Sequence, residues 1–382
     1  MSDEFWESAA LRDPLWAILS DPSKKGRRWT TREFFATGQR EVSTLMYQLH
    51  QLGRMPARGR ALDFGCGVGR LTQALARFFP EVVGADISPT MLRLAEHANM
   101  APDRVRYVRN QPDHLAEFAA ETFDFVYSDI VLQHLPSHRA RRFITDFLRV
   151  LKPGGVTVFQ IPSERRSVEE RAFSAVSMDP RAYRAQIDVN TRLPPTLAPG
   201  EQTTLLVECQ NLSDDAWDQR VVGPIRLGNH WLSEAGDMLV QDDGRTLVDS
   251  VLLPSTPVRL SLQITAPLDV GRYVCELDLV HEGLTWFGHK GSRTARLPVE
   301  VTGDDVGGSH SLVDPDADIP LPEWDPELPA LESFEVGEFP MDGIHRDEVF
   351  ALISTAGGHI FHLEPDERGG PEWNGYRYYV QR

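Results

Sequence analysis

Three glycines at alternate positions, Gly65, Gly67 and Gly69, form the part of this sequence with the clearest chemical potential. They follow an apolar run at 61–64 that predicts a buried strand, and they precede a stretch that predicts a helix. Glycine accepts positive φ angles and leaves backbone amides open to a ligand, so a strand–turn–helix of this kind is typical of a nucleotide site. A dinucleotide site places its third glycine one residue later, where this chain has Arg70, and the spacing therefore disfavours a pyrophosphate.

A second strand is predicted at 82–86, and it ends in an acidic residue, Asp86. The distance from the glycines to Asp86 closes a strand–helix–strand unit, so this carboxylate is expected beside the glycine turn. There it can accept hydrogen bonds from both hydroxyls of a ribose. The simpler interpretation is a tight turn between a strand and a helix, followed by a solvated aspartate.

A third apolar strand, 123–128, becomes polar at its end, at Ser128 and Asp129. Ligands of open α/β sheets bind at the carboxyl ends of the strands, so both residues are candidates for a site.

A helix is predicted over 137–151, with Ser137 as its N-cap and apolar residues at three-four spacing. The stretch 152–155 is expected to end this helix, and a further strand is predicted at 156–162.

The run D-x-G-x-G-x-G at 63–69, the acid at 86 and the stretch L-K-P-G-G at 151–155 resemble the class I S-adenosylmethionine (SAM) dependent methyltransferases. The resemblance extends from about residue 29 to 162 and points to the small-molecule branch of the family, the type 11 and type 12 methyltransferases. It implies an α/β fold with a Rossmann-like seven-stranded sheet, and SAM as the cofactor. The cofactor-binding residues that it implies in the sheet domain are Asp63, Gly65, Cys66, Gly67, Gly69, Asp86, Ile87, Asn110, Gln111 and Ser128.

One position departs from the pattern of the family. The acid that commonly meets the adenine amino group falls near Gln111 in this chain, flanked by Asn110 and Asp113. A side-chain amide can still pair with the adenine edge, so Asn110 and Gln111 are the expected contacts.

The first 50 residues are predicted to form helices that cap the mouth of the cofactor site. In related enzymes such a cap lies on the methionine end of SAM, which implies Trp29 and Arg28 as cofactor contacts, with Arg27 as a second partner for the carboxylate. The alternative is that the aromatic residues belong to the core and that the arginines are solvated.

Methyl transfer from a sulfonium needs mainly in-line placement of the acceptor, and removal of a proton when the acceptor is a hydroxyl. His134 is the candidate base, because an imidazole titrates near neutral pH and this residue closely follows a strand end. Asp129 is expected to orient His134 or to bind the substrate. A histidine that begins a helix and bonds to backbone is the alternative. Cys66 is expected to be a packed residue without a nucleophilic role, and no metal site is predicted.

Length and composition limit the number of domains and the class of protein. The chain has 382 residues, too many for one typical domain, and 41% of them are hydrophobic. No early apolar run follows a basic start, no stretch approaches a membrane span, and three cysteines make a poor disulfide framework, so a cytoplasmic protein is expected.

The net charge of −17 is concentrated between Gly303 and Gly343, a stretch with twelve acidic residues, six prolines and no lysine or arginine. This composition predicts an extended acidic, proline-rich linker over 303–342. Because the rest of the chain is nearly balanced and has no basic stripe, nucleic acid is not an expected partner.

Between 183 and 302 the helical period gives way to short alternating strands separated by proline and glycine turns, a pattern typical of a β-sandwich. Tyr273 stands two residues before Cys275, and this resembles the tyrosine corner of immunoglobulin-like domains. Cys209 and Cys275 fall where such domains place the bond between their sheets. We expect two buried free thiols, with a disulfide as the alternative.

Three tryptophans of this region, Trp217, Trp231 and Trp286, suggest recognition of a substrate or a partner. Aromatic faces stack on sugars, which makes glycan binding one hypothesis, and ordinary core packing is the other.

The last forty residues return to an α/β pattern, with a helix predicted at 345–356 and strands at 360–363 and 376–380. Residues 1–165 contain only five predicted strands, so this segment would complete a seven-stranded sheet. A third small domain is the alternative, although so few residues bury little core. The predicted organisation is a discontinuous domain of 1–165 and 343–382 with an insertion at 183–302.

Together these patterns predict a SAM-dependent methyltransferase that acts on a hydroxyl of a sugar, a glycan or a similar polar metabolite. An N-methyltransferase of a small natural product is the alternative within the class. In a third hypothesis the chain is a non-catalytic SAM-fold adaptor in a polysaccharide assembly, which the intact glycine run and Asp86 disfavour. The expected partner is a small-molecule or glycan acceptor, a homo-oligomer is left open, and no membrane span is expected.

Overall fold

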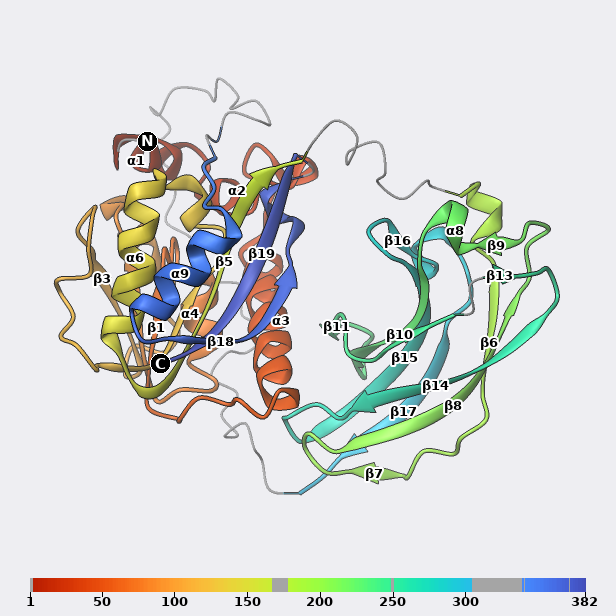
Figure 1. Ribbon diagram of the computed structural model, residues 1–382. Helices are drawn as coiled ribbons and strands as arrows, with labels where there is room; N and C mark the ends of the chain where they lie inside the picture. Colours follow the sequence, from red (N-terminus) through yellow and green to blue (C-terminus); the bar gives the residue numbers. More distant parts are fainter. Residues whose placement is uncertain (1–2, 167–177, 249–250, 304–338, 340, 371) are drawn as a thin grey trace. The chain divides into compact units, whose positions relative to one another are not determined.

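The computed structural model describes residues 3–166, 178–248, 251–303, 339, 341–370 and 372–382. The chain divides into two compact units, both drawn in Figure 1. Unit 1 comprises Met1–Val42, Arg54–Ser167 and His310–Arg382, and unit 2 comprises Ser43–Gly53 and Val168–Ser309. The predicted linker lies outside the described residues except at positions 303, 339, 341 and 342.

A seven-stranded sheet forms the centre of unit 1. Its strands are β1 (Arg60–Phe64), β2 (Glu81–Asp86), β3 (Val105–Arg109), β4 (Phe123–Ser128), β5 (Leu151–Arg165), β18 (His359–Pro365) and β19 (Trp373–Gln381). Their order in the sheet is β18-β19-β5-β4-β1-β2-β3. The five earlier strands run parallel, whereas β19 is antiparallel to β5 and β18 is antiparallel to β19. This is a Rossmann-like, mostly parallel sheet, as the motifs predict.

The longest strand of this sheet, β5, begins earlier than its sequence predicts. The preceding helix ends at Val150 and the strand begins at Leu151, so the expected stop at 152–155 is part of the strand. Gly154 has a φ of +80°, and its amide donates to the carbonyl of Arg382 at 2.9 Å. The glycine therefore serves the pairing with the end of the chain and does not separate helix from strand.

Two helices, α6 (Ser137–Val150) and α9 (Arg346–Thr355), cover one face of the sheet, as Figure 1 shows. Ser137 is the first residue of α6 and not its N-cap, which is Pro136. The carboxylate of Asp342 accepts a hydrogen bond from the Ser137 amide at 2.7 Å in place of a local cap. The core on this face includes Leu62, Phe143, Phe147, Phe159, Val349, Ile353 and Tyr378.

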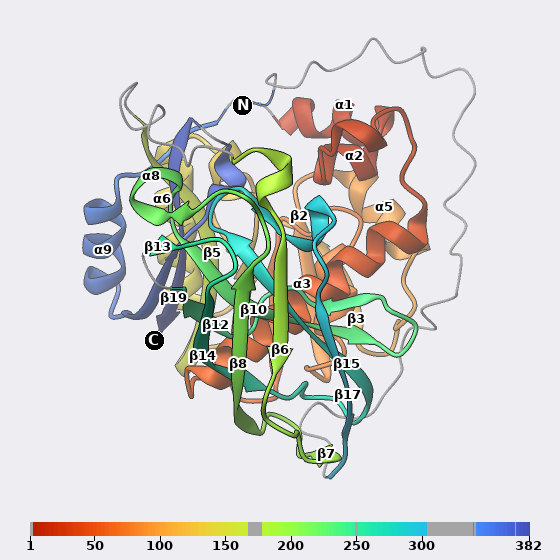
Figure 2. The same cartoon turned by 90° about the vertical axis from the view of Figure 1, so that its right-hand side faces the viewer.

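The opposite face of the sheet carries α3 (Thr31–Gln51) and α4 (Arg70–Leu75). Tyr127 donates to Glu41 of α3 at 2.8 Å, and Thr72 of α4 donates to Asp63 at 2.6 Å. Helices α1 (Asp3–Arg12) and α2 (Pro14–Ile18) pack near α5 (Pro89–His97), which Figure 2 shows. The short helices of this unit are η1 (Pro22–Lys24), η2 (Leu132–His134) and η5 (Glu367–Gly369).

Two packed β-sheets and a separate two-stranded sheet, in which β9 (Trp217–Asp218) pairs with β13 (Val251–Leu252), form the described part of unit 2. The strands of the first are β7 (Thr196–Leu197), β10 (Ile225–Ser233), β11 (Met238–Val240), β12 (Arg245–Leu247), β15 (Gly271–His281), β16 (Thr285–Trp286) and β17 (Ala295–Val301). The second contains β6 (Ala185–Val189), β8 (Gln202–Asn211) and β14 (Pro257–Thr265), which lie side by side in Figure 2. Smaller elements are β9 (Trp217–Asp218), β13 (Val251–Leu252), η3 (Pro180–Ala182), α8 (Gln219–Val222) and η4 (Gly288–Lys290).

Alternate residues of each strand build the core between these two sheets. Along β8, Leu205, Val207 and Cys209 are buried, and they share one core with Leu277 and Leu279 of β15. The period of two that predicts a half-buried strand is therefore present.

The last turns of α3 are part of unit 2. Tyr47 is buried in this core, and its hydroxyl lies within hydrogen-bond distance of two acceptors, the Asp243 carboxylate and the Thr265 carbonyl, the latter at 2.9 Å. Asp243 also accepts from Trp231 Nε1 and from Asn229 Nδ2, each at 2.9 Å. Burial raises the pKa of Asp243, so these donors compensate for its loss of water.

Two features of unit 2 match the sequence expectation. The Tyr273 hydroxyl donates to the Asp269 carbonyl at 2.9 Å, the bond that a tyrosine corner makes. Cys209 and Cys275 are buried free thiols, as predicted, and burial raises the pKa of Cys209 to about 12.

Among the described residues, no helix has both the length and the apolar character that a membrane crossing requires.

The three tryptophans considered as sugar contacts are core residues. Trp217 and Trp231 are 0% exposed and Trp286 is 7% exposed. The Trp217 indole donates to the Ala182 carbonyl at 3.0 Å. The hypothesis of an exposed aromatic platform is therefore wrong for these residues, because no ring face is open to a ligand.

Candidate active site

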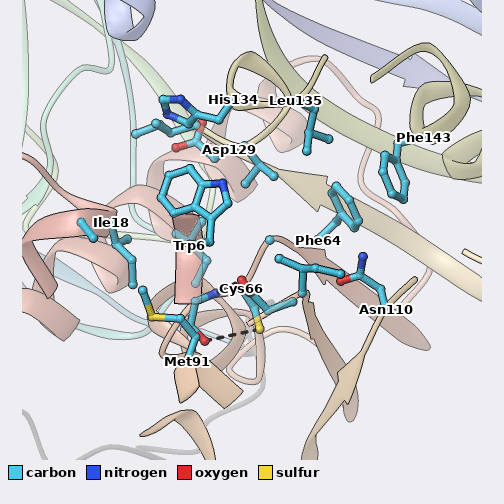
Figure 3. Close-up of a pocket in the computed structure, with 18 of the residues that line it drawn as sticks. Trp6, Ile18, Phe64, Cys66, Met91, Asn110, Asp129, His134, Leu135 and Phe143 are labelled. Carbon is cyan, nitrogen blue, oxygen red and sulfur yellow. Dashed lines mark hydrogen bonds between the residues drawn. The ribbon is translucent and has the colours of Figure 1, made fainter. Parts of the chain in front are cut away.

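A cavity lies at the carboxyl ends of the central strands of unit 1, and Figure 3 shows side chains that line it. Together with its open mouth, the empty space amounts to about 1080 Å³. Its walls come from α1, α2, the glycine turn, the ends of β2 and β4, and the start of α6. The lining residues include Trp6, Ile18, Cys66, Met91, Asn110 and Phe143.

The glycine turn forms one wall of this cavity. Gly65 and Gly67 line it, with φ angles of +78° and +52°. A Cβ added to Gly65 would lie 2.2 Å from the Val131 side chain, so the turn tolerates no larger residue there. Gly69 is not a lining residue, because it faces the Tyr107 hydroxyl, which would lie 2.1 Å from an added Cβ. The first two glycines keep the cavity open, and the third permits close packing.

Asp86 ends β2 at the cavity, beside Ile87, which also lines it. Its carboxylate accepts from the Gly67 amide at 2.8 Å and from the Ser88 amide at 2.9 Å. Burial raises the pKa of Asp86, and these two amides oppose that effect. Burial also raises the pKa of Cys66, so this thiol is a neutral part of the wall.

The two amides expected near the adenine take different positions. Asn110 lines the cavity, and its Nδ2 donates to the Gln111 carbonyl at 2.8 Å. The Gln111 side chain is exposed, and its backbone amide donates to Glu117 at 2.6 Å. Pro112 lines the cavity in its place.

Asp63 and Ser128 lie behind the cavity wall. Asp63 accepts from Thr72 at 2.6 Å, which joins β1 to α4, and burial raises its pKa to about 7. The Ser128 hydroxyl is buried and has no hydrogen-bond partner among the described residues. Neither residue lines the cavity, in contrast to the expectation for both.

Arg28 and Trp29 are also placed outside the cavity. Arg28 is exposed, and Trp29 packs among the N-terminal helices. The turn before them explains this placement, because the Asp13 carboxylate accepts from the Gly26 amide at 2.9 Å and from the Arg27 amide at 2.8 Å. Asp13 is also the N-cap of α2, so the segment is held against that helix.

Trp6 and Ile18, which no sequence motif singled out, line the cavity from α1 and α2. Helix α1 is fixed by Glu7, whose carboxylate accepts from Ser88 Oγ at 2.6 Å and from the Thr90 amide at 3.2 Å. Burial opposes the ionisation of Glu7, but these hydrogen bonds outweigh it and lower its pKa. The sequence offers only the apolar pattern of a helix here, which does not reveal what the helix covers.

His134 ends η2 and lines the cavity. Its ring lies edge-on to Trp6, with 5.2 Å between the ring centres, and its Nε2 is 3.1 Å from Gln133 Nε2. Figure 3 shows His134, Asp129 and Trp6 on one side of the cavity. An imidazole in this position can take a proton from a group bound in the cavity.

Asp129 follows β4 and lines the cavity, although its side chain is buried. Its carboxylate pairs with Arg368 at 2.5 Å and with Arg377 at 3.2 Å. Glu41 belongs to the same cluster, 2.7 Å from Arg368 and 3.1 Å from Arg70. Asp129 was expected to orient the candidate base or to bind substrate, and the partners found for it are two arginines from the end of the chain.

The pKa values of Glu41 and Asp129 shift in opposite directions. Burial acts to raise the pKa of Glu41, but the charges of Arg70 and Arg377 outweigh it and lower the pKa to about 2. Burial and the charge on Glu41 raise the pKa of Asp129.

No metal centre is found in the part of the chain that the structure describes, since no three His, Cys, Asp or Glu side chains there converge as ligands.

The fold is the Rossmann-like sheet of a methyltransferase domain, and the family of the matched segment implies SAM as the cofactor. Residues 62–159 match the family model described as "Methyltransferase domain". This segment contains the last three residues of β1, the glycine turn, Asp86 and His134.

Two curated relatives are similar over this part of the chain. A trans-aconitate 2-methyltransferase from Variovorax paradoxus is 33% identical over 129 residues, which cover 33% of this chain and 47% of the relative. A ubiquinone biosynthesis O-methyltransferase from Cereibacter sphaeroides is 36% identical over 160 residues, 41% of this chain and 58% of the relative. The chain thus spans about half the length of the curated relatives that it matches.

Among solved structures, a SAM-dependent methyltransferase from Clostridium acetobutylicum aligns over 90% of this chain and 91% of its own. The sequence identity is 10% and the TM-score is 0.38, so no argument rests on this alignment.

Proposed function

We propose that this protein is a SAM-dependent methyltransferase that transfers a methyl group to an oxygen atom of a small polar acceptor. The proposal rests on one observation: the glycine turn, Asp86 and His134 all line the same cavity of the methyltransferase domain. The names of the two relatives support an oxygen acceptor, since one refers to trans-aconitate and the other to an O-methyltransferase of ubiquinone biosynthesis.

The residues of the cavity fit the cofactor. Asp86 would hold the ribose, and Gly65 and Gly67 allow close approach because a Cβ there would fill the cradle. Ile87 and Asn110 would adjoin the adenine. When bound, SAM supplies a methyl group on a sulfonium, an electrophile that is reactive without further activation.

The remaining task of the protein is to position the acceptor and to manage its proton. For a hydroxyl acceptor, His134 takes the proton as the oxygen attacks. A carboxylate acceptor is already ionised and needs no base, so the importance of His134 distinguishes the two oxygen classes.

The finer assignments are part of the same proposal. A sugar or glycan hydroxyl is one candidate acceptor, although the buried tryptophans of unit 2 lend it no support. An amine of a small natural product is the alternative acceptor. We also propose the cytoplasm as the compartment, supported by three cysteines that are all free thiols.

Unit 2 is proposed to be an immunoglobulin-like insertion without chemistry of its own. Its two packed sheets and the Tyr273 hydrogen bond to Asp269 support that class. The domain boundaries of the sequence analysis, with 1–165 and 343–382 as one domain, belong to this proposal too.

The proposal is tested with methyl-labelled SAM, the full chain and four acceptors: trans-aconitate, a catechol, a hexose and a primary amine. We expect label in an oxygen acceptor. Mild alkali then releases labelled methanol from an ester but not from an ether or an amine. Failure to bind S-adenosylhomocysteine in calorimetry would overturn the proposal, and binding with no transfer to any acceptor would favour the adaptor hypothesis.

A further inference from the structure

Phe339 packs against four aromatic rings of unit 1 that come from distant parts of the sequence. The distances between ring centres are 5.7 Å to Phe5, 5.9 Å to Trp6, 5.9 Å to Trp16 and 6.0 Å to His134. The planes of Trp6 and Phe339 differ by 23°, so these two rings stack. Aromatic rings at such distances attract one another. A residue of the predicted linker is therefore part of the packing around the N-terminal helices and η2.

Two rings of this cluster belong to the cavity wall. Trp6 and His134 line the cavity, and Figure 3 shows them on the same side of it. Their ring centres are 5.2 Å apart. Phe339 is not a lining residue. It therefore contacts the two wall rings without forming part of the wall itself.

The segment that follows Phe339 is bound to the chain on both sides of His134. The Asp342 amide donates to the Gln133 carbonyl at 2.8 Å, and the Asp342 carboxylate accepts from the Ser137 amide at 2.7 Å. Gln133 lies in η2, and Ser137 begins α6. These two bonds fix the segment beside the short helix that carries the candidate base.

The end of this segment is fixed on the sheet. Ile344 is 1% exposed and belongs to the core beneath α6 and α9. A Cβ added to Gly343 would lie 2.5 Å from the Ser163 carbonyl oxygen, so the backbone passes close to β5 at this glycine. We refer to Phe339 and residues 341–344 as the strap.

The orientation of His134 depends on contacts of this kind. Helix η2 is only three residues long, and the imidazole turns about two side-chain bonds. Trp6 packs against the ring from α1, and Phe339 packs against it from the strap. A catalytic side chain keeps a productive geometry when packing locks its rotamer. For a transfer reaction, a displacement of about 1 Å can lower the rate by roughly a hundredfold.

We propose that Phe339 positions His134 and Trp6 against the methyl acceptor, and that the strap thereby sets the rate of methyl transfer. The inference rests on the proposed function, since it requires an acceptor in this cavity. The contacts of the strap involve η2, α6, β5 and the N-terminal helices but neither Asp86 nor the glycine turn. Cofactor affinity should therefore not depend on Phe339. A ring that served only the core would affect stability and leave the rate per folded molecule unchanged.

Single-turnover rates test the positioning role. The acceptor is whichever of trans-aconitate, a catechol, a hexose and a primary amine the wild-type chain methylates with labelled SAM. Phe339→Ala is expected to lower the rate about tenfold to a hundredfold, because the wall rings lose their support. By calorimetry, its affinity for S-adenosylhomocysteine should change by less than about threefold, which also shows that the variant is folded.

Two further variants separate the ring from its volume. Phe339→Tyr keeps the ring, and it should restore the rate to within about threefold of the wild type. Phe339→Leu keeps an apolar side chain without a ring, and it should remain slow. The matched control is Phe350→Ala, which removes a 41% exposed ring of α9 and should change neither the rate nor the affinity.

Nuclear magnetic resonance tests the contact without an acceptor. The full chain is labelled with ¹³C in its histidine rings, and the His134 signal is assigned by its absence in His134→Gln. An aromatic ring shifts the resonances of nearby protons, so this signal should move in Phe339→Ala and Phe339→Leu. It should stay near its wild-type position in Phe339→Tyr and in Phe350→Ala.

The outcomes separate this inference from the proposed function. A wild-type chain that binds S-adenosylhomocysteine but methylates none of the four acceptors would contradict the proposed function before any variant is compared. If the wild-type chain is active, an unchanged rate in Phe339→Ala refutes the positioning role. Equal losses of rate and of cofactor affinity would show that Phe339 is only structural, and an unmoved His134 signal would refute the contact.

Discussion

Glu41 of α3 and Arg368 of η5 form an ion pair at 2.7 Å, although 327 residues separate them in the sequence. Arg368 also binds Asp129, a residue of the cavity wall. Arg368, which lies between β18 and β19, therefore holds the carboxyl end of β4 in place. Stability and the shape of the site are coupled through this cluster.

Removal of Arg368 should destabilise unit 1 strongly. Arg368→Gln leaves Glu41 and Asp129 with fewer charged partners, and breaking a buried pair costs about 3–5 kcal/mol. Because Arg368 is 28% exposed, we expect the lower end, about 3 kcal/mol, in urea unfolding. The control is Arg141→Gln, whose partner Glu348 is 44% exposed, and it should cost less than about 1 kcal/mol. Equal costs would show that the cluster is not a buried network.

Asp63 should make stability depend on pH. Burial raises its pKa to about 7, above the unfolded value of about 3.9. The folded state thus binds the proton more tightly than the unfolded state. The contribution of Asp63 to the free energy of unfolding is therefore fully present below about pH 3.9 and is lost as the pH rises through about 7. Asp63→Asn removes this titration, and its amide oxygen can still accept from Thr72.

We therefore expect the unfolding free energy of Asp63→Asn, relative to wild type, to increase between pH 4 and pH 8. Urea unfolding at several pH values measures it. A difference that is constant over this range would show that Asp63 is ionised in the folded protein throughout.

Asp86 should act on the ribose of the cofactor. Asp86→Ala is expected to weaken the binding of S-adenosylhomocysteine and of 5′-deoxy-5′-methylthioadenosine equally, by about 1.5–3 kcal/mol, because both ligands carry the ribose. Since burial raises the pKa of Asp86, the wild-type affinity should fall as acid pH protonates this carboxylate. Asp113→Ala, at a 45% exposed acid outside the cavity, is the control. Unchanged affinity in a folded Asp86 variant would remove it from the ribose site.

His134 should matter for the methyl-transfer step and not for cofactor affinity. For a hydroxyl acceptor, His134→Ala is expected to lower the single-turnover rate by about a hundredfold to ten-thousandfold. The His134→Ala variant should bind S-adenosylhomocysteine nearly as tightly as the wild-type protein does. An unchanged rate with an ester product would identify a carboxylate acceptor, and an unchanged rate with an ether product would exclude His134 as the base.

Truncation before His345 should unfold unit 1. The shortened chain lacks α9, β18 and β19, which exposes the edge of β5 and the apolar side of α6. Circular dichroism and calorimetry with S-adenosylhomocysteine measure the loss. A chain ending at residue 166 that stays folded and binds this ligand would contradict the proposal of a discontinuous domain.

Local patterns in the sequence were sufficient for most strands of the sheet and for part of the site, although they assigned no range to β3 (Val105–Arg109). The glycine spacing predicted a turn with positive φ at Gly65 and Gly67, since no other residue type adopts that backbone easily. The acid that ends the second predicted strand, Asp86, does line the cavity. The strand pattern at 360–380 predicted a hairpin, and β18 pairs with β19. Each of these features depends on residues that are close in the sequence.

The tertiary structure alone decided which side chains meet in the cavity. Trp6 reaches it because Glu7 anchors α1 on α5, whereas Arg28 does not because Asp13 holds the preceding turn. No periodicity relates Glu41 to Arg368, since their contact depends on how α3 and η5 pack on the same face of the sheet. Hydrophobic spacing specifies which face of an element is buried, but the partner across that face is specified only by the packing of the whole unit.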